Sequence, residues 1–351
     1  MAQTTASGLD AAAVASFQKH LAQSKRTVAI IGAGLSAASG LPTFRDTNGL
    51  WRSHDVFLIA SPAGWRHDPG LVWQFYAERR HAALGAAPNP AHHALAALAK
   101  QKPGFVALSQ NVDGLLQRAG MTNPAQLKLL HGNLFDLTCA GNCGYVDYNN
   151  VEDPLCPVLD ANSTAKKTNV MGADIKEGER PPKASALLFD AIAAKNRKIL
   201  GDDKFTAAAP SASDAAPLRQ PGKDAPKIPD IAPKLHSGIG KSELPQCPQC
   251  KEHLLRPRVV WFGEALPRDV VEYVDALFAE DAEEIDLCLV IGTSSKVWPT
   301  AGFCEQARKR GAKVAWVNTK PEDVKKAREG DWVFLGDAGV VLPEVLGTGE
   351  K

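Results

Sequence analysis

The chain has 351 residues, of which 44% are hydrophobic, enough to bury one large core or two smaller ones. A formal net charge of +1 gives no general attraction to nucleic acid or to an anionic membrane, so we expect neither as a partner. No apolar run approaches the roughly 20 residues that a membrane span needs. The seven cysteines are an odd number in a long chain without a signal peptide, which favours a reducing compartment.

The first predicted elements are a helix and a strand. Val14, Phe17 and Leu21 lie at helical spacing within residues 9–24, and the continuous apolar run Val28–Ile31 predicts a buried strand. We assign this helix to the fold, and the residues ahead of it contain no arginine. We therefore expect no transit peptide and place the protein in the cytosol or nucleus, with a mitochondrial location left open.

A glycine-rich turn follows the first strand. Gly32 and Gly34, with Ala37 in third place, match the dinucleotide-binding fingerprint, in which a pyrophosphate approaches the bare backbone and the amides of the next helix hold it. A plain tight turn is the alternative interpretation of so short a pattern. The continuation Ser39–Arg45 is unusual for a Rossmann helix and favours a nucleotide site.

Strands and helices then alternate along the chain, a rhythm that predicts a doubly wound parallel sheet in an α/β protein. After an irregular loop over 46–61 anchored by Trp51, we predict helices over 70–81, 92–99 and 265–279, and strands over 104–109, 127–130, 258–262, 285–291 and 313–317. Polar residues follow several strands, where open α/β sheets bind ligands. Gln110–Asp113 could also be an Asx turn, and His131 a structural histidine.

A cysteine-containing region interrupts this rhythm. We predict a discontinuous Rossmann-like domain over 10–138 and 251–346, with a small helical part around 46–100, an inserted zinc-ribbon module over 139–250 and a tail over 347–351. The module carries an insertion at about 157–240, in which 206–233 has the composition of a poorly ordered linker and 184–200 has helical spacing. This insertion is a candidate tether, lid or docking segment for a protein partner.

Two cysteine pairs, Cys139/Cys143 and Cys247/Cys250, can supply four thiolates to a tetrahedral zinc ion. A redox function for the second pair is the alternative, although a thioredoxin-like setting is lacking. With every position filled by sulfur, the zinc would stabilise the fold and take no part in catalysis. We expect one free thiol and two core residues among the other cysteines, which are Cys156, Cys288 and Cys304.

Taken together, these motifs resemble those of the sirtuin family, in the family's order, from about residue 10 to residue 346 except for most of 157–240. The resemblance implies an NAD-dependent protein lysine deacylase with a Rossmann-like domain, a zinc ribbon and a cleft between them, which gives nicotinamide and O-acyl-ADP-ribose. The segments that carry it are Gly32–Arg45, Gln110–Asp113, His131–Gly132, the two cysteine pairs, Val260–Glu264 and Gly292–Ser295.

The resemblance also implies a role for individual residues. His131 would be the general base, Asn111 and Asp113 would orient the nicotinamide carboxamide, and Phe44 would shield the reactive carbon from water. The acylated peptide would add as a strand along Val260, Trp261, Phe262, Gly263 and Glu264. NAD would be contacted by Gly32, Ala33, Gly34, Ser36, Phe44, Arg45, Trp51, Gln110, Asn111, Asp113, Gly292, Thr293, Ser294, Asn318, Thr319, Lys320 and Ala338.

Tyr76 and Arg79 bear on the acyl group that is removed. Three residues apart on one helix, a phenol and a guanidinium can bind a carboxylate together. Alone, such a pair is more often a half-buried tyrosine beside a surface arginine. The segment is similar to that of class III, desuccinylase-type sirtuins, which implies removal of succinyl, malonyl and glutaryl groups and weak activity on acetyl-lysine.

Two other functions stay open at this point. One is protein mono-ADP-ribosyl transfer, which would need no acyl pocket. The other is an NAD- or ADP-ribose-sensing interaction protein that works through the insertion, but binding alone would not need His131, Asn111 and Asp113. The sequence also departs from the family, since Cys139 and Cys143 are one residue further apart than is common and Ala338 stands where cysteine is frequent.

Overall fold

A computed structural model describes residues 4–5, 7–43, 50–51, 54–160 and 237–348. The predicted helix at 184–200, the predicted linker at 206–233 and two expected NAD contacts, Phe44 and Arg45, lie outside these residues. The α-helices are α1 Ala11–Gln23, α2 Val56–Ile59, α3 Pro62–His67, α4 Pro69–Gly85, α5 Pro90–Gln101, α6 Leu115–Arg118, α9 Arg268–Phe278, α10 Phe303–Lys309 and α11 Ala338–Val345. The 3₁₀ helices are η1 Ala33–Ser39, η2 Pro157–Leu159, η5 Lys241–Glu243, η6 Thr300–Gly302 and η7 Pro321–Val324.

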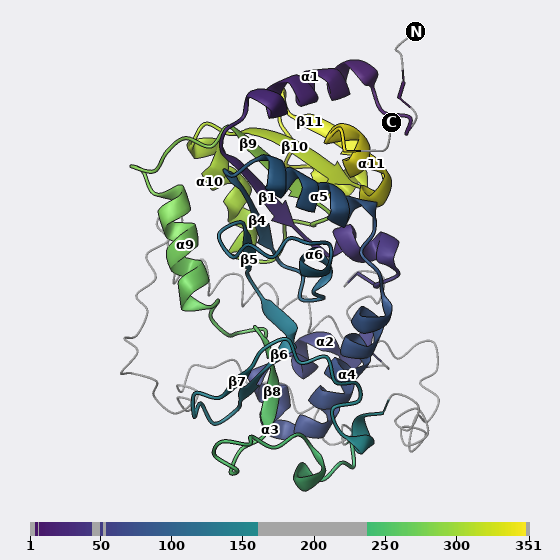
Figure 1. Cartoon of the computed structure of the whole chain (residues 1–351), viewed down its shortest axis with the longest axis vertical. Helices are drawn as coiled ribbons and strands as arrows, with labels where there is room; N and C mark the ends of the chain where they lie inside the picture. Colours follow the sequence, from purple (N-terminus) through teal and green to yellow (C-terminus); the bar gives the residue numbers. More distant parts are fainter. Residues whose placement is uncertain (1–3, 6, 44–49, 52–53, 161–236, 349–351) are drawn as a thin grey trace.

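The larger part of the molecule is built on a six-stranded sheet, in the order β11-β10-β9-β1-β4-β5. Every neighbouring pair in it is parallel, and helices lie on both sides (Figure 1). This confirms the doubly wound α/β fold predicted from the sequence. The strands of this sheet are β1 Thr27–Ile31, β4 Phe105–Ser109, β5 Leu127–Leu129, β9 Leu287–Ile291, β10 Lys313–Asn318 and β11 Trp332–Leu335.

Successive residues of the central strand β1 enter different cores, as the two-residue period of a strand requires. Ala29 and Ile31 lie in the cluster formed with α1, α5 and α11, whereas Val28 and Ile30 lie in the cluster formed with α9 and α10. β1 is buried along its whole length, which explains why its sequence is continuously apolar. Its side chains therefore fix two helical layers against one sheet.

The smaller part contains a three-stranded sheet in the order β7-β6-β8, below the main sheet in Figure 1. Both of its pairings are antiparallel. α4 packs on β6, and these elements share a third core with the cysteines of the predicted zinc site. The strands here are β6 Gly132–Cys139, β7 Val146–Asp147 and β8 Leu255–Val259.

The strand predicted over 258–262 is wrong in position, because β8 ends at Val259. The next residues are apolar, but their amides leave the ladder: that of Val260 donates to the carbonyl of His131, and that of Phe262 donates to the carbonyl of Ala60, at 2.9 Å each. Burial against α2 and α3 explains their hydrophobicity equally well. The strand also belongs to the antiparallel sheet, whereas its apolar run reads like a strand of the parallel one.

Three other local expectations need correction. The loop predicted over 46–61 contains a two-residue hairpin, β2 Leu50–Trp51 with β3 His54–Asp55, and the helical turn α2. The helix expected after the glycine turn is the 3₁₀ helix η1. α4 is longer than predicted at both ends, because Asp68 caps its first turn by accepting from the Leu71 amide and Pro69 occupies a first-turn position.

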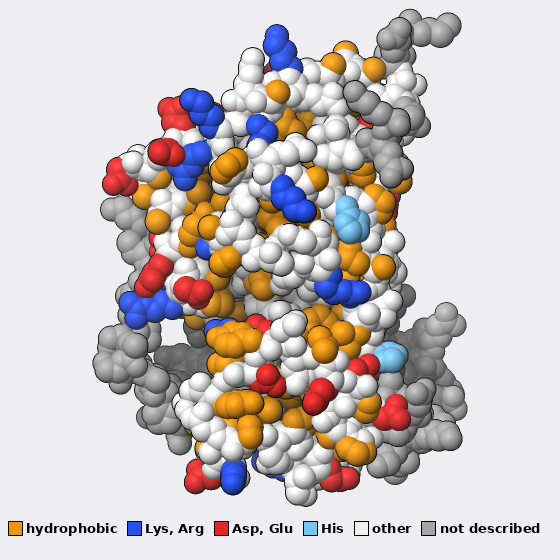
Figure 2. Space-filling view, in the orientation of Figure 1, with side chains coloured by type: hydrophobic (Ala, Val, Ile, Leu, Met, Phe, Trp, Pro, Cys, Tyr) orange, Lys and Arg blue, Asp and Glu red, His pale blue; other side chains and the backbone are white. Residues whose placement is uncertain are grey.

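The visible surface is mixed in character. In Figure 2 the described basic and acidic side chains are interspersed over both parts of the molecule, in agreement with the net charge of +1. Within the described residues, none of the helices combines the length and apolarity that crossing a bilayer would take.

Candidate active site

Four predicted motifs follow β1, β4, β9 and β10. Because these strands are parallel, the motifs meet at the edge of the six-stranded sheet that is formed by the carboxyl ends of its strands. β1 has β4 on one side and β9 on the other, so its carboxyl end is the point where the strand order reverses, the usual ligand site of such sheets. At this point the Gly34 amide donates to the Gly292 carbonyl at 2.9 Å. A Cβ on Gly34 would lie 2.7 Å from the Gly292 Cα, so this close approach itself requires glycine.

Side-chain hydrogen bonds tie the loops after these strands together. Gln110, after β4, donates through Nε2 to the hydroxyl of Thr293, after β9, at 3.2 Å. Asn318, at the end of β10, donates through Nδ2 to the Thr293 carbonyl at 3.1 Å. Thr293 is therefore the residue on which three of the predicted NAD-binding loops converge.

A second group of polar side chains surrounds Ser36 in η1. The Ser36 hydroxyl donates to Oδ2 of Asp113 at 2.7 Å and accepts from Nδ2 of Asn111 at 3.2 Å. Burial raises the pKa of the Asp113 carboxyl, and the hydrogen bonds from the Leu115 amide and from Ser36 oppose this effect. The two residues expected to orient nicotinamide are thus brought together and anchored through one serine.

His92 belongs to this group although the sequence analysis treated it only as part of a helix. The Asn89 amide donates to its Nδ1, so Nε2 carries the proton and faces the Ser36 hydroxyl at 3.4 Å. Burial lowers the pKa of His92 to about 4, which keeps the ring neutral. The signal was present in the sequence: Asn89, Pro90 and His92 form a capping box at the start of α5.

His131 lies between β5 and β6, close to the end of β4. Its Nδ1 contacts the carbonyl of Gln110 at 3.1 Å, and because a carbonyl can only accept, Nδ1 carries the proton. Burial lowers the pKa of His131, and the Gln110 carbonyl partly opposes this. The ring is therefore neutral near pH 7 with Nε2 unprotonated, the form that a general base requires.

The donor set at this edge suits a dinucleotide. It consists of backbone amides, carboxamides and hydroxyls at a switch point, with glycines where a backbone lies close to another. The residues that would hold NAD here are Gly32, Gly34, Ser36, Gln110, Asn111, Asp113, Gly292, Thr293 and Asn318. Ala33, Ser294, Thr319 and Lys320 lie on the same loops, and Ala338 begins α11, which packs on η1.

Trp51 is placed differently from the other predicted NAD contacts. Its ring meets that of Phe75 edge to face at 5.5 Å, and its indole nitrogen donates to Glu78. Both partners are residues of α4, so Trp51 lies against this helix.

Tyr76 and Arg79 lie beside each other on α4. Tyr76 is 3% exposed, and burial raises the pKa of its hydroxyl while the charge of Arg79 opposes this. The Arg79 guanidinium lies over the ring of Phe75, 3.5 Å from its centre. Burial lowers the pKa of Arg79 to about 10, and among the described residues it has no hydrogen-bonding or ion-pair partner.

The predicted peptide-binding segment 260–264 runs next to this pair. The ring of Trp261 stacks on Tyr76 at 6.5 Å, and its amide donates to Glu264 Oε2 at 2.9 Å. The amides of Val260, Phe262 and Glu264 also donate within the protein. A peptide added as a strand would therefore draw mainly on carbonyl oxygens of this segment.

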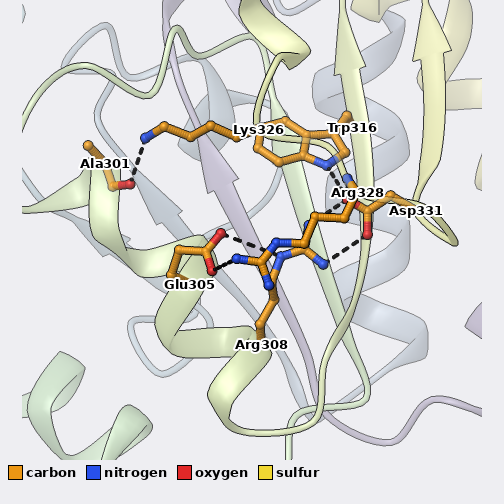
Figure 3. Close-up of polar contacts among 7 residues, drawn as sticks. All are labelled: Ala301, Glu305, Arg308, Trp316, Lys326, Arg328 and Asp331. Carbon is orange, nitrogen blue, oxygen red and sulfur yellow. Dashed lines mark hydrogen bonds and ion pairs between the residues drawn. The ribbon is translucent and has the colours of Figure 1, made fainter.

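A polar network supports the loop after β9 (Figure 3). Lys326 donates to the carbonyls of Ser295 and Ala301, at 3.1 and 3.3 Å. Nearby, Arg308 and the Trp316 indole donate to Asp331, which fixes the segment that carries Lys326 against α10 and β10. The loop that follows Gly292 is thus held at its middle and at its end.

Four cysteine sulfurs form a cluster in the smaller part of the molecule. Cys139, Cys143, Cys247 and Cys250 lie with all Sγ atoms within 4.8 Å of one another. Cys139 and Cys250 are 3.7 Å apart and Cys143 and Cys247 are 3.6 Å apart, too far for disulfides. Thiolates at about 2.3 Å from one tetrahedral zinc would lie about 3.8 Å apart, so the cluster fits the predicted structural ion.

Comparisons with known proteins agree with this geometry. The Sir2 family profile matches residues 32–177 and 229–299. An NAD-dependent protein deacylase of Candida albicans is 38% identical, over 94% of this chain and 95% of the relative. The mitochondrial NAD-dependent protein deacylase sirtuin-5A of Xenopus laevis is 32% identical, over 96% of this chain and 86% of the relative.

Solved structures give the same result. A crystal structure of a Sir2 homologue in complex with NAD superimposes with a TM-score of 0.62 and 27% identity, covering 95% of this chain and 93% of the other. Since both the profile and the relatives extend over the sheet edge, the histidine and the cysteine cluster, the protein described here is a member of the Sir2 family.

Proposed function

We propose that this NAD-dependent protein deacylase removes acidic acyl groups, namely succinyl, malonyl and glutaryl, from protein lysines, with weak activity on acetyl-lysine. The observation that carries the proposal is the guanidinium of Arg79, which has no hydrogen-bonding or ion-pair partner within the part of the chain that the structure describes and lies beside the buried Tyr76. The deacylase names of the relatives support the kind of reaction. The choice of acyl group rests on this pair.

Arg79 stands in contrast to its neighbour. The Arg80 guanidinium is fully buried and donates to the carbonyls of Leu134, Asn150 and Glu152. Among the described residues, Arg79 has the face of Phe75 and the neighbouring Tyr76 against it, and no anion. A charge held in low-dielectric surroundings without an anion is costly, and a substrate carboxylate would remove this cost through charge-assisted hydrogen bonds.

The same argument disfavours an acetyl group. A methyl end can neither accept a hydrogen bond from Arg79 nor neutralise its charge, and it would displace water that otherwise solvates the guanidinium. Tyr76 can donate its hydroxyl proton to the same carboxylate. Its raised pKa keeps that proton in place at neutral pH.

When bound, NAD supplies the electrophilic ribose carbon that accepts the acyl oxygen. His131 would take up a proton at Nε2 from a ribose hydroxyl, while Nδ1 stays fixed on the Gln110 carbonyl. Asn111 and Asp113 would hold the carboxamide of nicotinamide, and Ser36 with His92 keeps both side chains in position. The segment 260–264 would align the peptide between the acyl pocket and His131.

The test is NAD-dependent deacylation of one peptide that carries succinyl-, malonyl- or acetyl-lysine, with the acyl-ADP-ribose product detected by mass spectrometry. We expect succinyl and malonyl turnover far above acetyl turnover. Arg79→Met should lower kcat/KM for the succinyl peptide by about 100-fold and leave the acetyl value within about threefold, whereas Arg79→Lys should retain part of the preference. Acetyl preference in the unaltered enzyme would refute the proposal.

The cellular location of the protein and its protein partners can be tested directly. From the sequence we propose the cytosol or nucleus, with a mitochondrial location as the alternative, and the sirtuin-5 relatives are named mitochondrial. Imaging of a carboxy-terminally tagged chain in its own cells decides between them. Pull-down with the full chain and with residues 161–236 replaced by a short linker tests whether the insertion binds a protein partner.

A further inference from the structure

A second arginine stands near the acyl pocket. Arg256, in β8, lies over the indole of Trp261 with its guanidinium carbon 3.2 Å from the ring centre. The same indole stacks on Tyr76, with an angle of 24° between the ring planes. The ring of Trp261 therefore contacts both Arg256 and Tyr76, and the charges of Arg79, Arg256 and Glu264 all act on the Tyr76 hydroxyl.

The two arginines differ in their partners. Arg256 donates from both terminal nitrogens to the two carboxylate oxygens of Glu264, at 2.7 and 2.9 Å, and also to the Val259 carbonyl at 3.0 Å. Glu264 receives one more hydrogen bond, from the Trp261 amide. The Glu264 carboxylate is thus held by three hydrogen bonds and fixed in direction, whereas Arg79 has no anion among the residues that the structure describes.

We propose that Arg256 is a specificity-determining positioning residue, which holds Glu264 in a bidentate ion pair and so leaves Arg79 available to the carboxylate of the substrate. The inference rests on the proposed function. A released Glu264 would be a flexible carboxylate on the segment whose Trp261 ring stacks on Tyr76, the side chain next to Arg79 on α4. It would compete with the acyl group as an internal counter-ion for Arg79.

Charge balance leads to the same conclusion. Two guanidinium groups and one carboxylate leave one positive charge around Tyr76, which matches the single negative charge of a succinyl or malonyl group. Arg256 needs no contact with the substrate for this role. The role requires the two parallel hydrogen bonds of a guanidinium, because the ammonium group of a lysine would fix the direction of the Glu264 carboxylate less well.

The test compares kcat/KM for succinyl- and acetyl-lysine versions of one peptide at saturating NAD. Arg256→Gln should lower the succinyl value about tenfold, mainly through KM, and change the acetyl value less than about threefold. Arg256→Gln combined with Glu264→Gln removes the competing charge and should recover most of the succinyl-to-acetyl ratio. Arg268→Gln, which breaks an exposed ion pair with Glu272 on α9, is the matched control and should change neither value.

Two results would overturn the inference: equal loss with both peptides in Arg256→Gln, or no recovery of the ratio in the double variant. If the unaltered enzyme has no preference for succinyl-lysine, the proposed function itself fails. If the preference exists and Arg256→Gln retains it, only the inference fails. Should Arg256→Gln not fold, Arg256→Lys keeps the charge without the fork, and we expect an intermediate ratio from it.

Discussion

Arg79 and Arg80 are adjacent in α4, but their guanidinium groups have opposite surroundings. Arg80 donates to the backbone carbonyls of three residues, whereas Arg79 lies on an aromatic ring and has no anionic partner among the described residues. A half-buried charge without an anion adds little to stability, which is common where a protein binds a ligand. We therefore propose that Arg80 serves folding and Arg79 serves substrate recognition.

This contrast gives a prediction for stability. Arg80→Met should lower the free energy of unfolding by about 3 kcal/mol or more, because three carbonyls lose a charged donor. Arg79→Met should leave that free energy unchanged or raise it by up to about 1 kcal/mol, while succinyl-lysine turnover falls. Urea denaturation of both variants at one pH measures the difference. Comparable losses in both would mean that Arg79 has a structural partner.

His131 gives a prediction for the pH dependence of the reaction. As the proposed general base, His131 would act in its neutral form, and a lowered pKa keeps the ring neutral to more acidic pH. The acidic limb of kcat/KM for the peptide should therefore lie below about 6.5, the value of an unperturbed histidine. An acidic limb above that value would contradict the burial described for this ring. His131→Asn should abolish turnover and retain NAD binding, as measured by calorimetry.

At the scale of single elements, the shape of the loop after β9 is held by the side chain of one lysine, Lys326. Lys326 holds the carbonyls of Ser295 and Ala301, so Lys326→Met should loosen the loop that carries Thr293. We expect KM for NAD to rise about fivefold, with kcat and the KM of the peptide nearly unchanged. The exposed neighbour Lys325, changed to Met, is the control. An unchanged KM for NAD in Lys326→Met would mean that the loop holds its shape alone.

Elements were predictable from the sequence where periodicity and burial agree. One strand of the main sheet, β11, was missed although its four residues Trp332–Leu335 are all apolar. The longer apolar runs of β1, β4, β9 and β10 led directly to those strands. β8 was displaced by three residues because hydrophobicity alone does not separate a ladder from a buried irregular segment. The carbonyls of His131 and Ala60, which accept from the amides of Val260 and Phe262 just after β8, are brought there by tertiary packing.

The candidate site was predictable to the extent that short motifs mark it. Glycines, His131, the cysteines and the Tyr76/Arg79 pair are visible as local patterns. His92 acts through Ser36, which is distant in the sequence. Arg256 contacts Trp261 and Glu264, which are near it in the sequence, but its link to the distant Tyr76 runs through the ring of Trp261. Contacts of this kind depend on the fold and leave little local signal.

At the scale of the whole molecule, the cysteine cluster that fits zinc packs into the same core as the residues of the proposed acyl pocket. Cys139 and Cys247 share a buried cluster with Tyr76 and Trp261. Removal of zinc by a chelator should therefore abolish deacylation and lower the melting temperature, and zinc analysis should give about one ion per chain. Cys156→Ser should keep both the ion and the activity. Activity that survives complete removal of zinc would show that the acyl pocket does not need the ion.

The position of β1 has a consequence for how the chain is made. β1 pairs with β4 on one side and with β9 on the other, where Val28 lies opposite Cys288, and Gly34 fits against Gly292. A ribosome delivers β1 and β4 early and β9 only near the end of translation, after the whole insertion. Until then the growing chain carries an unpaired apolar strand edge, which is prone to aggregate and is a natural target for chaperones. The nucleotide site is completed only when the last third of the chain has emerged.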